Sequence, residues 1–158
     1  MSTSADALFC TKSKKKGTKQ PALRSVGQGK LDEAEKTLRE SLEIEYRLRG
    51  KDGQHADISA SLHELGGVFY AKGELAEAEA HFRSSLAMEY KLYGEEAQTP
   101  AIAAVLHELG VVCRTQGRLE ESEEYFRRSL DAEYAVHGRE AKHPDIAATL
   151  HELARVRL

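Results

Sequence analysis

The residues in this sequence that are best suited to catalysis or metal binding lie in three His-Glu-Leu triplets. They begin at His63, His107 and His151. A helical His-Glu pair belongs to a zinc-protease site when a second histidine follows four residues after the first, because both rings then lie on one helix face. The residues at those positions are Gly67, Val111 and Arg155. The zinc-protease interpretation therefore fails, and we expect no metal site at these triplets.

Other catalytic arrangements also fail. Equivalent histidines on successive helical repeats are expected on the order of 10 Å apart, whereas a zinc–imidazole bond is about 2 Å long, so the three triplets cannot share one ion. Ser84, Ser85 and Ser129 fall in the middle of expected helices, without the strained turn that exposes a nucleophilic serine. We therefore expect no enzyme activity, no catalytic residue and no cofactor.

The triplets belong to an internal repeat with a period of 44 residues, which also relates Gly29, Gly73 and Gly117. Residues 73–114 and 117–158 are identical at 22 of 42 aligned positions, spread over the whole unit. Sequence duplication is the only reasonable explanation of this agreement.

Each repeat predicts a long helix followed by a shorter one. Apolar or small residues recur every three or four positions from Leu75 to Tyr93, and Gly94 and Pro100 then mark the end of one helix and the start of the next. The glycines interrupt the helices too often for a continuous coiled coil. The sequence predicts an all-α fold of six helices, alternating long and short, with no sheet.

The segment LHELGGVFYAKGELAEAEAHFRSSL (62–86) resembles a tetratricopeptide repeat, and residues 138–154 resemble the longer repeats of kinesin light chains. The resemblance covers 29–158, although His-Glu stands where kinesin light chains usually have two asparagines. It implies a right-handed α-solenoid of antiparallel helix pairs, whose shorter helices line a concave groove for peptides or partner proteins.

The expected groove residues come from the shorter helices. At about 100° per residue, His63 and Glu64 point away from the apolar stripe of their helix, and Tyr70 lies beside His63. The candidate partner-binding residues are His63, Glu64, Tyr70, His107, Glu108, Arg114, His151, Glu152 and Arg155. The alternative is that duplication alone made the triplets alike, with glutamates that are merely solvated. No specific role is expected for the histidines at 55, 81, 137 and 143.

Charge divides the chain into two parts. Residues 1–30 carry a net charge of +6 and residues 31–158 carry −9. We expect residues 1–28 to form a disordered basic leader, followed by repeat units at 29–72, 73–116 and 117–158. The lysines of the leader, Lys12, Lys14, Lys15 and Lys16, could form a nuclear address or contact an anionic surface, but such runs are common in solvated tails.

With two distant cysteines and no apolar run of membrane-spanning length, the cytoplasm is the expected compartment.

Three functions fit these features. The favoured one is a non-catalytic protein-protein interaction module that binds a peptide or partner protein in its groove. The first alternative is a structural assembly element, or a fragment of a longer solenoid, acting by end-to-end stacking. The apolar stripe of the helix at 145–157 would then mediate self-association, because no further long helix follows to cover it. The second alternative is a nucleic-acid-binding helical repeat, which the −9 charge of residues 31–158 disfavours.

Overall fold

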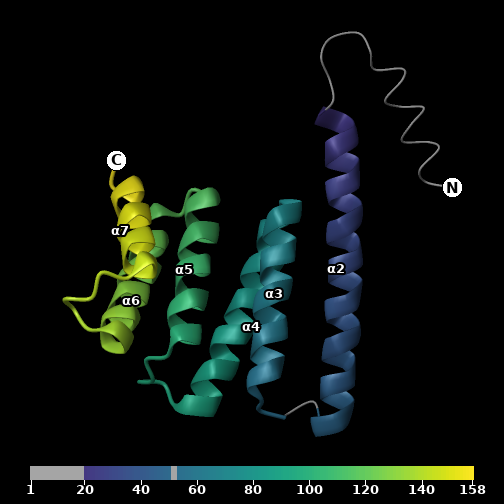
Figure 1. The fold of residues 1–158 in the computed structure, drawn as a ribbon, viewed down its shortest axis with the longest axis horizontal. Coiled ribbons are helices and arrows are strands. Elements are labelled where there is room, and N and C mark those ends of the chain that lie inside the picture. The colour runs from purple at the N-terminus through teal and green to yellow at the C-terminus, as the bar shows by residue number, and fades with distance from the viewer. Residues whose placement is uncertain (1–19, 51–52) are drawn as a thin grey trace, which may run out of the picture.

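The computed structural model describes residues 20–50 and 53–158, with side chains from residue 27 onward. Within these ranges the chain forms six α-helices and no strand, and the helices stand side by side in chain order (Figure 1). The helices are α2 (Gln20–Arg49), α3 (Ala56–Lys72), α4 (Leu75–Tyr93), α5 (Pro100–Thr115), α6 (Leu119–His137) and α7 (Pro144–Val156). The expected all-α solenoid of six helices is confirmed.

The N-terminal boundary differs from the expectation. Helix α2 begins at Gln20 and continues through Gly29, so the last part of the expected leader, residues 20–28, is helical. The sequence allows this because Pro21 falls in the first turn, where a missing N–H is tolerated, and Ala22 and Leu23 favour a helix. The expected disorder of residues 1–19, and the lysine cluster within them, lie outside the described residues.

The short helices begin at one recurring type of cap. The Nδ1 atoms of His55 and His143 accept the backbone N–H of the residue two positions later, at 3.2 and 3.3 Å, and so cap α3 and α7. Thr99 occupies the equivalent position of the middle repeat, and its hydroxyl accepts the N–H of Ile102 at 3.1 Å. The expectation that these two histidines lack a specific role is therefore wrong, because a cap satisfies a donor that the helix itself leaves unpaired.

The closest packing occurs in two helical hairpins, α3–α4 and α5–α6. A Cβ atom added to Gly66 would lie 2.6 Å from the ring of Phe82, and one added to Gly110 would lie 2.7 Å from the ring of Phe126. Both rings are completely buried. Each hairpin can therefore close only because a short helix offers a bare backbone to an aromatic ring of the following long helix.

Buried serines reinforce the same hairpins. The Ser85 hydroxyl donates to the backbone carbonyl of Ser59 at 2.9 Å, and the Ser129 hydroxyl donates to that of Ala103 at 2.8 Å. Both serines have no exposed surface. These hydroxyls hold two helices together, which explains why the repeat retains serine here.

Ion pairs connect each long helix to the end of the following short helix or to the turn just after it. Glu35, Glu79 and Glu123 occupy one repeat position, and they pair with Lys72, Arg118 and Arg157 respectively. The hydrogen bond from Lys72, followed by that from Arg39, lowers the pKa of Glu35. Lys72 also contacts Asp32 at 2.8 Å and lowers the pKa of that carboxyl.

Replacing Gly66 or Gly110 with alanine should destabilise the protein by roughly 1–3 kcal/mol, because each new methyl group would overlap a buried phenylalanine ring. Gly67 provides the matched control, because it is helical and a Cβ atom there meets nothing within 4 Å. Gly67→Ala should stabilise by about 0.5–1 kcal/mol. Urea denaturation measures all three, and equal effects at positions 66 and 67 would contradict the packing account.

Replacing Lys72 with methionine should lower the melting temperature at pH 7, and this difference should shrink as the pH falls below about 4. The folded-state pKa values of Asp32 and Glu35 are lowered, so their contribution is present above the unfolded values near 3.9 and 4.3 and is lost as pH falls through the folded values. Lys91→Met, on the exposed side of α4, is the control. Thermal melts from pH 7 to pH 2 test this, and a difference independent of pH would refute it.

Candidate partner-binding site

Two pockets lie between successive short helices at equivalent positions of the repeat. The first junction pocket lies between α3 and α5, with α4 contributing Glu89, and has a volume of about 610 Å³. The second junction pocket lies between α5 and α7, with α6 contributing Glu133, and has a volume of about 290 Å³. Two pairs of polar lining residues correspond at the 44-residue offset, His63 with His107 and Glu89 with Glu133.

The two glutamates were not predicted from the sequence. Each is only 4% exposed, although it carries a carboxylate. Glutamate is almost never buried unless it is paired. The available signal was an acidic residue that recurs before a tyrosine, as Glu45, Glu89 and Glu133, within the otherwise apolar stripe of the long helices.

A hydrogen-bonded chain fixes the polar groups of the second junction pocket. The hydroxyl of Thr149 donates to Oε1 of Glu133 at 2.7 Å, and Nδ1 of His107 lies 2.9 Å from the same hydroxyl oxygen. Because the single threonine proton goes to the carboxylate, Nδ1 of His107 must be the donor to Thr149. The Ser129 hydroxyl, whose proton goes to the Ala103 carbonyl, lies 3.1 Å from the same Glu133 oxygen. This chain ties α5, α6 and α7 together at the pocket.

The first junction pocket lacks the hydroxyl that stands at the centre of the hydrogen-bonded series in the second pocket. Val105 stands where the later repeat has Thr149, and it lines the pocket together with His63 and Glu89. The Nε2 atom of His63 is buried and has no hydrogen-bond partner among the described residues. The two junctions are therefore alike in residue type but differ in how their polar groups are satisfied.

The two pocket histidines lie closer to the core than expected. The ring of His63 packs against Phe82 with centroids 5.5 Å apart, and the ring of His107 packs edge-on against Phe126 at 5.4 Å. Both side chains are half-buried. The sequence-based projection placed them off the apolar stripe, but the phenylalanine of the following long helix reaches their flank and covers it.

The remaining candidate residues divide into two groups. Arg114 and Arg155 both pair with Glu152, at 3.0 and 2.9 Å, and the Tyr70 hydroxyl lies 3.4 Å from that of Thr115. These contacts connect successive short helices or stay within α7, while Glu108 lines the second junction pocket. Outside this group, Glu64 is exposed and lies against α2, and His151 is exposed.

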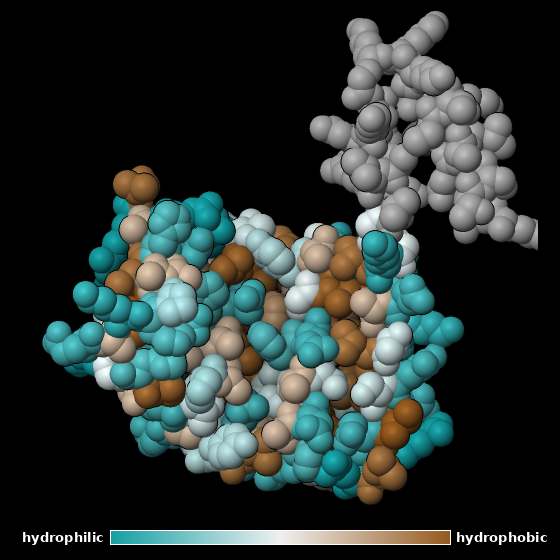
Figure 2. Space-filling view, in the orientation of Figure 1, coloured by the Kyte–Doolittle hydropathy of each residue, from teal (hydrophilic) through white to brown (hydrophobic). Residues whose placement is uncertain are grey.

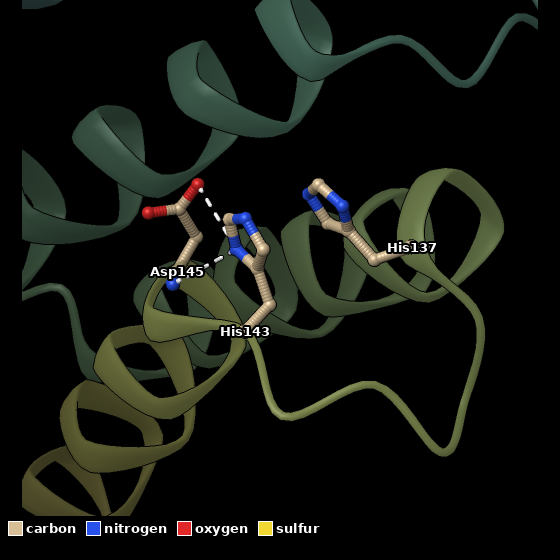
Figure 3. Close-up of side chains that lie close together, drawn as sticks. All are labelled: His137, His143 and Asp145. Atoms are coloured by element: carbon tan, nitrogen blue, oxygen red, sulfur yellow. Dashed lines mark hydrogen bonds and ion pairs between the residues drawn. The ribbon is translucent and has the colours of Figure 1, made fainter.

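A second cluster, His137, His143 and Asp145, has residue types that bind metals (Figure 3). The two imidazole rings are stacked, with centroids 3.7 Å apart and planes 11° apart. Ring-nitrogen lone pairs lie in the ring plane, so stacked rings direct them almost parallel and not toward one ion at about 2 Å. Nδ1 of His143 also accepts the Asp145 N–H. As arranged, the cluster stabilises the start of α7 and closes one side of the pocket.

Comparison with known proteins agrees with this geometry. The tetratricopeptide repeat family model matches residues 26–91, 57–135 and 101–158. BtubC (BKLC) from P. vanneervenii superposes with a TM-score of 0.68 at 22% identity, covering 81% of this chain and 49% of that one. This chain thus spans about half the length of BtubC. No curated protein matches the sequence.

Two further crystal structures contain the nearly identical TPR-like repeats of a candidate kinesin light chain from Podosopora anserina. One, a point variant, has a TM-score of 0.62 at 25% identity, and the other has 0.59 at 24%. Each match covers 96% of this chain and 73% of the other chain. The structural neighbours are therefore kinesin light chain-like repeat proteins, as the 138–154 segment suggested.

Exchanging the residues at the two junctions should have unequal effects on stability. Thr149→Val should cost roughly 1–3 kcal/mol, because it leaves His107 and Glu133 without the shared hydroxyl. Val105→Thr should be tolerated, because Glu89 lies in the same pocket to accept a hydrogen bond. Val112→Thr, at a completely buried apolar site, is the control and should cost about 1–3 kcal/mol. Denaturant titration measures the free energy of unfolding of each variant. Equal losses of stability in Val105→Thr and Val112→Thr would contradict the structural equivalence of positions 105 and 149.

Proposed function

Because the chain belongs to the tetratricopeptide repeat family, we propose that it is a non-catalytic module that binds a peptide or partner protein in the groove lined by α3, α5 and α7. Tetratricopeptide repeats generally mediate protein-protein interaction, and helical solenoids do so through extended concave surfaces. The observation that most supports this proposal is the recurrence of the junction pocket in successive repeats.

The surface favours polar recognition over a large apolar contact. On the side of the molecule turned to the viewer, Figure 2 shows apolar side chains in patches separated by polar ones. Large contiguous apolar patches mark the interaction sites and ligand-binding grooves of many other proteins. A partner that enters the groove would therefore be selected by charge and hydrogen bonding at the junction pockets.

End-to-end stacking has less support. Leu150 of α7 is 44% exposed, but the other apolar residues of its stripe, Ile146, Leu153 and Val156, are buried. Stable interfaces bury about 800 Å² on each partner, and one exposed leucine supplies little of that area. Self-association through 145–157 is therefore the second candidate.

Nucleic-acid binding is the least favoured alternative, because residues 31–158 carry a net charge of −9 and would repel phosphate. None of the helices in the described ranges is long and apolar enough to cross a bilayer. We propose the cytoplasm as the compartment, by analogy with the kinesin light chain-like neighbours, with the nucleus as the alternative if the lysine cluster at 12–16 acts as an address.

The histidine triplets allow a direct test of groove binding. A variant with His63→Ala, His107→Ala and His151→Ala should capture at least tenfold less partner than the wild-type chain, because two of these rings line the junction pockets. The measurement is quantitative affinity capture with mass spectrometry, after circular dichroism has shown that the variant is folded. The control replaces Arg83, Glu124 and Arg127, which are exposed residues of the long helices. Equal losses in both variants, or none in either, would refute groove binding.

A further inference from the structure

The residues lining the two junction pockets have an unbalanced charge. Histidines are their only side chains able to carry positive charge, because no lysine or arginine lines either pocket. The carboxylates lining them are Asp57, Glu89, Glu108, Glu133 and Asp145. Of these five, only Asp57 has an arginine or lysine partner within the described ranges, Arg49 at 3.6 Å. The pockets are therefore local sites of largely uncompensated negative charge.

The carboxylate of Glu133 gives a second, independent indication of a ligand. Its Oε1 atom accepts from Thr149 and lies 3.1 Å from the Ser129 hydroxyl, but its Oε2 atom is buried and has no hydrogen-bond partner among the described residues. The side chain is 96% buried, given its 4% exposure, and it lines the second junction pocket. An ionised carboxylate in such a position is costly unless a cation or further donors compensate it.

From this charge pattern we infer that the two junction pockets bind a basic, extended segment of a partner protein, with one lysine or arginine side chain entering each pocket. This inference rests on the proposed groove function and specifies its ligand. An ammonium or guanidinium group supplies several donors and the missing positive charge, which matches Glu89 in one pocket and Glu133 in the other. An acidic peptide or a nucleic acid would be repelled by the same carboxylates.

The repeat geometry also limits the spacing of the basic residues. Helices packed directly on one another are about 8–10 Å apart, and we take this value for the separation of the two pockets, which lie on either side of α5. In a polyproline II helix, residues three apart lie on one face and are about 9 Å apart along the axis. A β-strand does not meet this requirement, because residues three apart point to opposite faces. The expected ligand therefore carries Lys/Arg-x-x-Lys/Arg in a polyproline II conformation.

Fluorescence anisotropy of the full chain with a labelled peptide, PPKPPKPP, tests the inference. This peptide should bind measurably at physiological salt, whereas PPEPPEPP should not, and PPKPKPPP should bind more weakly because its lysines are two residues apart. Glu89→Gln and Glu133→Gln should each weaken binding of PPKPPKPP about tenfold, as expected for loss of one charge-assisted contact. The double variant Glu96→Gln, Glu124→Gln is the matched control, because both glutamates are exposed.

Glutamine retains a carbonyl oxygen that can accept from Thr149, so Glu133→Gln should remain folded, and a thermal melt verifies this. If it does not, Glu89→Gln carries the test alone. Equal binding of the lysine and glutamate peptides, or wild-type affinity in the folded glutamine variants, would overturn the inference. If partner capture is lost in the triple histidine variant but kept in the glutamine variants, groove binding stands and the basic ligand does not.

Discussion

The contact between a glycine of the short helices α3 and α5 and a phenylalanine of the next long helix is the constraint on which the rest of the molecule depends. Gly66 meets Phe82, and Gly110 meets Phe126, at distances that leave no space for a methyl group. Because each hairpin closes on this contact, the backbones come near enough for buried serine hydroxyls to reach carbonyls across the interface. The repeat is therefore defined by a close approach of two helices more than by the total area of its core.

The candidate site is a product of the same contact. Each phenylalanine ring that meets a glycine also supports a histidine ring on the same short helix, His63 or His107. The histidines consequently have a fixed flank and present their other side to the junction pocket. Duplication of the hairpin has thus duplicated a pocket as well as a structural unit.

Much of the fold could be predicted from the sequence, because it depends on local signals. The helix periods, the glycines and prolines at their ends and the 44-residue repeat are all visible in the chain itself. The start of α2 could not be located, because a prolyl residue suits the first turn of a helix as well as a loop. The burial of Glu89 and Glu133 was also hidden, since it depends on which helices surround a side chain. For the same reason, Arg114 and Glu152 were selected as groove residues without any sign that they pair with each other.

The difference between Val105 and Thr149 makes the two junctions unequal in pre-organisation. In the later junction, the threonine hydroxyl links the carboxylate to the imidazole by hydrogen bonds. In the earlier one, Val105 provides no hydroxyl to link His63 with Glu89, so a ligand group would have to fix their hydrogen-bonding orientation. Immobilising a side chain with several rotamers costs about 0.5–1.5 kcal/mol. Two pockets that share a histidine and a glutamate would then differ in intrinsic affinity for a ligand group. If an extended ligand detached stepwise, its side chain in the second junction pocket would leave last.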